Sequence, residues 1–375
     1  MTGTSTLFPK SYEESRARFR QALEDVGRLW PNGRQGQHRL RGDEDLTIDW
    51  IEAGGLATQE NLLVLTTGEH GIEAYVGSAM LQLFIEEFLP RLSPANTGLL
   101  LIHAINPWGM KHRRRVNAAN VDLNRNFVVD GFDKLLNPDY TKVNGLLNPH
   151  HPISSLALND IRFIIKLLAA VADLGPSGIE VALPFGQYRY PQGLYYGGDM
   201  VQEETRVITD LYRRCFGNHD QILLLDMHTG YGPRYQMSLV NSCMEPRDSQ
   251  ELSKRFSYPS VAKMDASEFY RVQGDMIDFV YTLARDEFPG KRLYATTFEF
   301  GTLGDSLLAS FRTLRTLILE NQLHWFGAKG RVARERIGRA FQRLYAPDER
   351  DWREKAVADA RQAFEGILRA EALLS

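Results

Sequence analysis

Three residues of metal-binding types stand at the ends of apolar runs that could be strands. His70 and Glu73 form an H-x-x-E pair just beyond the run 62–67, where a helix is expected to begin near Glu73. A three-residue offset across such a turn can aim an imidazole and a carboxylate at one point. His228 follows the apolar run 222–227. Two histidines and one carboxylate leave a coordination position open, which is the pattern of catalytic zinc sites that activate water.

Neither part of this pattern is decisive by itself. An isolated H-x-x-E pair occurs by chance in many proteins, and one histidine after a strand is more often a packed turn residue. A metal site is therefore predicted only if the three residues converge. The remaining histidines show no comparable spacing; they are His38, His103, His112, His150, His151, His219 and His324.

A second polar segment, residues 106–127, reads NPWGMKHRRRVNAANVDLNRNF. In VDLNRNF, polar residues alternate with apolar ones, and this alternation predicts that the polar side chains face one side. Arginine binds a carboxylate through two parallel hydrogen bonds, and asparagine can add a further donor. Asn124 and Arg125 are therefore candidates for a clamp on a substrate carboxylate. The basic run 113–115 could equally be a solvated face.

The elements that must position these residues are alternating strands and helices. Short apolar runs followed by polar turns predict buried strands, and helical spacing predicts helices between them. We expect an α/β fold with a central mixed, mostly parallel twisted sheet, helices on both faces, and the site at the carboxyl ends of the strands. The expected strands are 62–67, 99–105, 222–227 and 293–300, and the expected helices are 11–30, 73–88, 159–174, 203–215 and 276–285.

Two stretches stand apart from this alternating pattern. Residues 128–200 are rich in Pro, Gly, Asn and Tyr and predict a long irregular insertion with one helix. Within it, the segment 186–198 (GQYRYPQGLYYGG) is either a packing loop or a wall of the substrate cleft. We assign residues 1–327 to one catalytic domain. Residues 328–375 form a charged helical extension packed on it, with Pro347 between two helices.

Composition excludes several other classes of protein. The chain has 375 residues, 43% of them apolar, and a net charge of −3, so a large core is possible and polyanion binding is not indicated. No apolar stretch is long enough to span a membrane. Two cysteines make no disulfide framework and no C-x-x-C zinc site. With no secretory signal visible, we expect a cytoplasmic protein. No G-x-S-x-G occurs, which disfavours a serine hydrolase.

Five motifs occur in a fixed order: H-x-x-E, N-P-x-G, V-D-L-N-R-N-F, a strand-borne histidine, and a late glutamate in T-F-E-F. This order resembles the zinc carboxypeptidase (M14) superfamily, which includes aspartoacylase-like N-acyl amino acid hydrolases. The resemblance is greatest to its DUF2817 metallopeptidase branch, through the segments GEHGIEAYVGSA, RRVNAANVDLNRNF and GQYRYPQGLYYGG. It extends over roughly residues 10–325.

The resemblance implies roles for the residues around a metal. His70, Glu73 and His228 resemble the ligands of one Zn²⁺ per chain. Asp122 resembles the carboxylate behind the first histidine, which fixes the tautomer of that ring. Glu299, in TTFEFGT, resembles the general base.

The resemblance also implies roles in binding the substrate. Asn124 and Arg125 resemble the pair that holds the terminal carboxylate of a substrate. Arg115 resembles the donor that polarises the scissile carbonyl, with Arg114 as the open alternative. Tyr270 resembles the mobile tyrosine over the substrate, in the pattern Y-x-x-x-G-x-x-I-D.

The function expected from these residues is zinc-dependent hydrolysis of an amide bond, first of all by a metallocarboxypeptidase acting next to a free carboxylate. The nearest alternative is an N-acyl amino acid deacylase or a peptidoglycan-fragment amidase. A more remote alternative is a non-catalytic zinc-binding or peptide-binding relative, which would be marked by loss of the base, whereas Glu299 is present. The expected partner is a small peptide or acyl-amino acid, with no nucleic acid and no membrane. The oligomeric state is left open.

Overall fold

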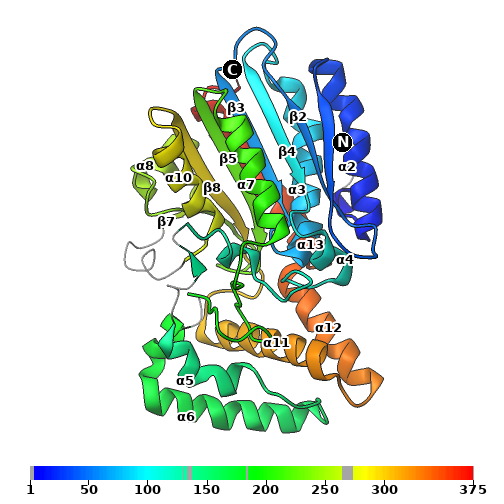
Figure 1. Ribbon diagram of the computed structural model, residues 1–375, viewed down its shortest axis with the longest axis vertical. Coiled ribbons are helices and arrows are strands. Elements are labelled where there is room, and N and C mark those ends of the chain that lie inside the picture. Colours follow the sequence, from blue (N-terminus) through cyan, green and yellow to red (C-terminus); the bar gives the residue numbers. More distant parts are fainter. Residues whose placement is uncertain (1–3, 130, 133–136, 183–184, 264–272, 375) are drawn as a thin grey trace.

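The computed structural model describes residues 4–129, 131–132, 137–182, 185–263 and 273–374. Its centre is an eight-stranded mixed sheet with the order β1-β2-β4-β3-β5-β8-β6-β7 (Figure 1). The pairs β3–β4, β3–β5, β5–β8 and β6–β7 are parallel, and the other three pairs are antiparallel. The strands are β1 Arg34–Arg39, β2 Thr47–Ala53, β3 Asn61–Thr67, β4 Thr97–His103, β5 Gln221–Thr229, β6 Met237–Asn241, β7 Val261–Lys263 and β8 Arg292–Phe300.

The four predicted strands are confirmed as β3, β4, β5 and β8. Every residue of β3, β4 and β5 is buried, as expected for parallel strands covered on both faces. The other four strands were not predicted. One of them, β1, reads RQGQHR, contains no buried residue and lies at one edge of the sheet, so its sequence carries no apolar signal.

Helices cover both faces of the sheet, as predicted. Alternate residues along each strand divide the core, so that Leu63 and Leu65 pack with one group of helices and Leu62 and Val64 with the other. The first group contains α2 (Tyr12–Leu29), α3 (Ala74–Glu87), α8 (Ser249–Phe256) and α13 (Arg350–Ala370), and the second contains α4 (Pro107–His112), α7 (Glu203–Phe216) and α10 (Met276–Glu287). Short helical pieces complete the main body: α1 (Thr4–Leu7), η1 (Gly71–Glu73), η2 (Leu89–Arg91) and η3 (Leu123–Arg125).

A separate layer of helices lies beyond one end of the sheet (Figure 1). It consists of α5 (Pro138–Leu147), α6 (Leu156–Ala182), α11 (Leu307–Phe326) and α12 (Arg331–Tyr345). The prediction of one helix within 128–200 was therefore wrong. The missed helix, α5, begins after Asn137, whose side-chain oxygen accepts a hydrogen bond from the Tyr140 amide, and Pro138 occupies its first position. This is a favourable start for a helix in a segment with little helical periodicity.

Two helices flank Pro347, as predicted: α12 ends at Tyr345 and α13 begins at Arg350. Helix α13 is part of the main core, since Phe364 and Ile367 are fully buried there. The domain boundary after residue 327 stays a prediction. Neither Cys215 nor Cys243 forms a disulfide within the described part of the chain. Among the described residues, no helix combines the length and the apolar character that crossing a bilayer requires.

Candidate metal centre and active site

The turn after β3 is held against the segment that follows α4. The amide of Gly71 donates to the carbonyl of Arg115 at 3.0 Å, and the amide of Ile72 donates to the carbonyl of Arg114 at 2.9 Å. A Cβ on Gly71 would lie 2.1 Å from the carbonyl carbon of Gly109, so this close backbone contact requires glycine. The turn and the Arg114–Arg115 backbone are therefore fixed relative to each other.

His70 lies in this turn between two carboxylates. Its Nδ1 is 3.0 Å from Oε1 of Glu73, and its Nε2 is 3.0 Å from Oδ1 of Asp122. Burial alone would raise the pKa of Asp122, but Arg115 and His70 hold that pKa well below its ordinary value. A charged Asp122 favours the proton on Nε2 and leaves the Nδ1 lone pair directed towards Glu73, as in histidines that bind metals.

His228, on β5, has the same arrangement. Its Nε2 is 2.5 Å from Oδ2 of Asp226, two residues earlier on the same face of the strand. Its Nδ1 is 3.6 Å from Oε2 of Glu73. The rings of His70 and His228 meet edge to face with centroids 4.8 Å apart. The two Nδ1 atoms thus converge on one carboxylate.

The buried polar atoms of this cluster fit a bound metal ion. Nδ1 of His70 is buried and makes no hydrogen bond within the described part of the chain, although Glu73 lies beside it. A buried nitrogen left unpaired costs free energy unless a ligand satisfies it. Two imidazoles and a carboxylate are a donor set that zinc prefers.

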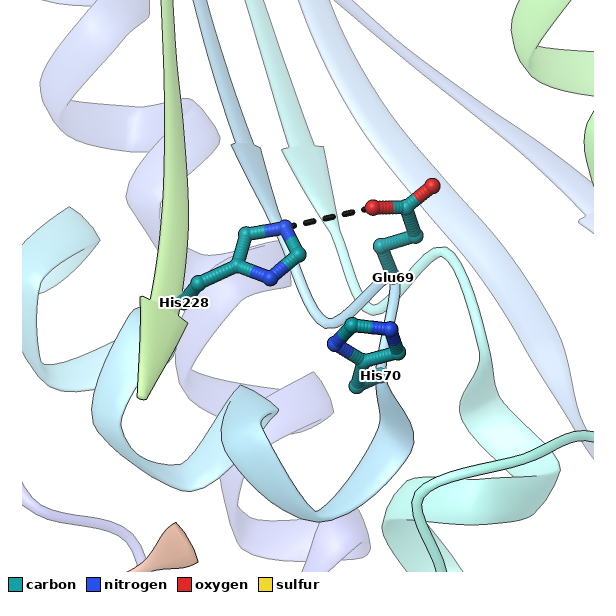
Figure 2. A group of neighbouring side chains, drawn as sticks. All are labelled: Glu69, His70 and His228. Atoms are coloured by element: carbon teal, nitrogen blue, oxygen red, sulfur yellow. Dashed lines mark ion pairs between the residues drawn. The ribbon is translucent and has the colours of Figure 1, made fainter. Parts of the chain in front are cut away.

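A second carboxylate, that of Glu69, forms an ion pair with His228 (Figure 2). Glu69, His70 and His228 offer ligand atoms that all lie within 4.8 Å of one another. Oε2 of Glu69 is 3.2 Å from Nε2 of His228, and neither oxygen of Glu69 forms a hydrogen bond to a described residue. Burial raises the pKa of Glu69 to about 7. If a metal were bound by Glu69 and Nε2 of His228, it would compete with Asp226 for that nitrogen. Glu73 instead faces the Nδ1 atoms of His70 and His228, which point away from Asp122 and Asp226.

Replacing each glutamate in turn distinguishes the two ligand sets. We expect Glu73→Gln to weaken zinc binding at least ~10-fold, because even residues behind a ligand cost that much when replaced. Glu69→Gln should keep zinc at the wild-type level, since Glu69 is not a member of the set formed by His70, Glu73 and His228. The measurement is a competition titration with a zinc-binding dye. Loss of zinc in Glu69→Gln together with retention in Glu73→Gln would assign the metal to the Glu69 set.

Glu299 lies opposite His228 on the neighbouring strand. The parallel register of β5 and β8 pairs these two residues directly. Oε1 of Glu299 accepts a hydrogen bond from the amide of Tyr231 at 3.0 Å. Burial raises the pKa of Glu299 to about 7, and the negative charge of Glu73 contributes in the same direction. A carboxylate with its pKa near neutrality beside these candidate metal ligands is suited to accepting and returning a proton.

The two candidate arginines lie in different surroundings. The guanidinium of Arg115 forms a close ion pair with Asp122, and its Nε is 3.8 Å from Oε1 of Glu73. Arg114 instead pairs with Glu320 on α11 at 2.8 Å. Of these two arginines, Arg115 is the one whose guanidinium lies beside Asp122 and Glu73.

The expected alternation in VDLNRNF was wrong, because residues Leu123–Arg125 form a turn of 3-10 helix. The side chains consequently diverge. Asp122 faces His70, while Oδ1 of Asn124 accepts a hydrogen bond from the amide of Met276 at 2.9 Å and so holds the start of α10. Arg125 is 8% exposed, and its Nη1 donates to the carbonyl of Asn124.

The Tyr-rich segment 186–198 packs along this turn. The carbonyl of Tyr196 accepts a hydrogen bond from the amide of Asp122 at 2.7 Å, and the hydroxyl of Tyr188 donates to the carbonyl of Arg125 at 2.7 Å. The segment therefore supports the backbone that carries Asp122 and Arg125. Tyr270, the predicted mobile tyrosine, lies outside the described residues.

Three residues beside the cluster were not identified from the sequence. Asp226 precedes His228 by two positions in DMH, and strand alternation would have placed both on one face. Glu69 adjoins His70, but the sequence does not predict which way the side chain of a single residue between a strand and a turn will point. Tyr345, at the end of α12, is buried near Arg115 and Glu73 and contacts Gly230, so it joins the cluster from a segment more than a hundred residues away.

Comparisons with known proteins agree with the sequence pattern. A family model described as "Protein of unknown function (DUF2817)" matches residues 8–359. No match was found among curated proteins. Carboxypeptidase A from Helicoverpa armigera is similar in structure, with 15% identity, a TM-score of 0.49, and coverage of 96% of this chain and 73% of the other.

Two further solved structures show weaker likeness. Bovine thrombin-activatable fibrinolysis inhibitor has 12% identity and a TM-score of 0.47, covering 84% of this chain and 96% of its own. The murein-tripeptide amidase MpaA from Escherichia coli O157 has 16% identity and a TM-score of 0.37, covering 82% and 97%. Likeness at this level carries neither a substrate nor an activity to this chain.

Proposed function

This chain belongs to the DUF2817 family of proteins of unknown function, and we propose that it is a zinc-dependent hydrolase. The proposed reaction is cleavage of an amide bond next to a free carboxylate, as in a metallocarboxypeptidase. The observation that carries the proposal is the convergence of Nδ1 of His70 and Nδ1 of His228 on the carboxylate of Glu73. Both Nε2 atoms are occupied by other carboxylates, so the two Nδ1 atoms remain available for a metal.

His70, Glu73 and His228 would hold the zinc ion. When bound, zinc supplies a Lewis acid that polarises a carbonyl group and makes a water molecule more acidic. Glu299, opposite His228, would take a proton from the attacking water and return it to the leaving amine. Arg115 would donate hydrogen bonds to the oxygen on which charge develops. Asp122 orients both His70 and Arg115.

The proposed carboxylate clamp, Asn124 and Arg125, decides between a carboxypeptidase and its nearest alternative. Arg125 is buried in the turn that follows Asp122, where an enclosed cation could pair with an anionic group. However, Oδ1 of Asn124 and Nη1 of Arg125 already have backbone partners. A substrate carboxylate would therefore have to contact the amide nitrogen of Asn124 and the other nitrogens of Arg125. The second candidate, an N-acyl amino acid deacylase or peptidoglycan-fragment amidase, would use the same metal chemistry on a different leaving group.

Substitution of Arg125 separates these two functions. If Arg125 binds the substrate carboxylate, Arg125→Ala should cost about 2–5 kcal/mol of transition-state stabilisation on a free-acid peptide, because a desolvated anion loses its partner. Arg125→Lys should restore part of the loss, since a point charge lacks the bidentate fork. The measurement is kcat/KM for a peptide with a free carboxyl terminus and for the same peptide amidated.

The amidated peptide is the internal control. Wild type should strongly prefer the free acid, and Arg125→Ala should remove that preference. An equal fall on both peptides, together with a lower melting temperature, would make Arg125 a structural residue. A wild type indifferent to the terminal carboxylate would contradict the carboxypeptidase and support the amidase.

A further inference from the structure

Helix α6 exposes a row of large aliphatic side chains. Leu158 is 39% exposed, Ile161 55%, Ile164 53%, Ile165 62% and Leu168 64%. The opposite side of the same helix is already packed, because its residues Phe163 and Leu167 contact the cluster formed by α5 and α11. The outer row is therefore not needed to hold α6 in this chain. Isolated exposed leucines are normal, but a continuous row of this size indicates a binding surface.

The spacing of the row indicates what it binds. Leu158, Ile161, Ile165 and Leu168 are separated by three, four and three residues, and Ala172, also exposed, continues the series after four more. This is the a/d repeat with which one helix packs its side chains between those of another. Neither a small ligand nor an extended peptide requires such a repeat. The surface therefore fits a helix as its partner.

We infer that the partner is α6 of a second copy, packed antiparallel about a two-fold axis midway between Ile165 and Leu168. In this register Ile165 of each copy meets Leu168 of the other, and Ile161 meets Ala172. Because the contact is isologous, one self-complementary surface closes the dimer. The pairing concerns a surface separate from the metal cluster and does not depend on the proposed reaction.

The charges beside the row fit this register. Arg162 and Asp173 lie on the same flank of α6, eleven residues or about three turns apart, and both are exposed. In the antiparallel pair, Arg162 of one copy lies near Ala169 and Asp173 of the other, so opposite charges approach each other on both sides of the axis. In a parallel pair in register, Arg162 of one copy and Asp173 of the other would instead be eleven residues apart along the helices and could not pair. The charge pattern therefore favours the antiparallel orientation.

The available area is adequate for a reversible dimer. The five exposed aliphatic side chains present on the order of 500 Å² per copy, compared with about 800 Å² per partner in a standard interface. Ala172, which continues the row, and the flanking residues Arg162 and Ala169 would supply part of the remainder. We therefore expect a dimer that dissociates on dilution.

The test is the mass of the complete chain in solution, measured by sedimentation equilibrium over a range of concentrations. Wild type should approach twice its mass of 42.7 kDa. Ile165→Glu and Leu168→Glu should each be monomeric at concentrations where wild type is a dimer, with unchanged circular dichroism. Val332→Glu is the matched control, because Val332 on α12 is 61% exposed and lies outside the row; it should remain a dimer.

Charge reversal tests the orientation. Arg162→Asp and Asp173→Arg should each raise the dimer dissociation constant at least ~10-fold, and the double variant should restore it. A monomeric wild type would overturn the inference. This holds also if the monomer binds lipid vesicles through this row. Retention of the dimer by both folded glutamate variants would also overturn it. Failure of the double reversal to restore the dimer would overturn the antiparallel register.

Discussion

Glu299→Gln is expected to lower kcat by about 10²–10⁴-fold while zinc content stays at the wild-type level. Glutamine keeps the shape of the side chain and can still accept the hydrogen bond from the Tyr231 amide, but it cannot take a proton. Because Glu299 is not among the proposed ligands, the metal should be unaffected. Kinetics on a hydrolysable acyl-amino acid or peptide, with elemental analysis of the same sample, provide the two readouts.

Glu287→Gln is a matched control for this substitution. Glu287 is an exposed glutamate at the C-terminal end of α10 that pairs with Arg213 at 2.6 Å, so its replacement should leave kcat unchanged. If Glu299→Gln keeps its activity, another group must activate the water. If it loses zinc together with activity, Glu299 is a ligand and the assignment of the base is wrong.

His70→Ala and His228→Ala are expected to lose zinc and, with it, nearly all hydrolysis. Each variant removes one of the three proposed donors, and two remaining donors bind zinc far more weakly. The fold should persist, because the cluster lies at the end of a sheet whose strands are buried along their length. Elemental analysis gives the zinc content. Added zinc should also raise the melting temperature of wild type and leave that of the variants unchanged.

His112→Ala is the control for removing an imidazole. His112 pairs with Glu44 at the surface, and its loss should not change zinc content. Full zinc occupancy in both His70→Ala and His228→Ala would exclude these residues as ligands. Zinc loss in only one of them would indicate a site that is shared with Glu69 or another donor.

The sequence predicted the centre of the fold because the central strands are buried on both faces. Runs such as LLVLT in β3 and ILLLDM in β5 have no exposed face and leave an uninterrupted apolar signal. Edge strands carry no such signal, and the exposed residues of β1 form a strand only because β2 pairs with them. Helix α5 was also missed from the sequence, because the segment that contains it has the composition of a loop.

For the site, residues within one motif could be placed from the sequence and residues brought together by the fold could not. His70 and Glu73 share one short turn, so their approach follows from local geometry. The direction of the Glu69 side chain and the position of Tyr345 beside the site depend on packing between distant segments. The turn at Leu123–Arg125 was misread for a related reason, because its side chains follow their tertiary partners and not the strand alternation that their spacing suggested.

The most direct test of the proposed function is hydrolysis by chelated and zinc-restored protein. The substrates are a free-acid peptide, the same peptide amidated, and an N-acyl amino acid. The proposal predicts that the chelated protein is inactive, that one equivalent of zinc restores activity, and that the free-acid peptide is cleaved fastest. Undiminished hydrolysis by the fully chelated protein would contradict metal dependence. A zinc-loaded protein that cleaves none of the three substrates would contradict the proposed hydrolase.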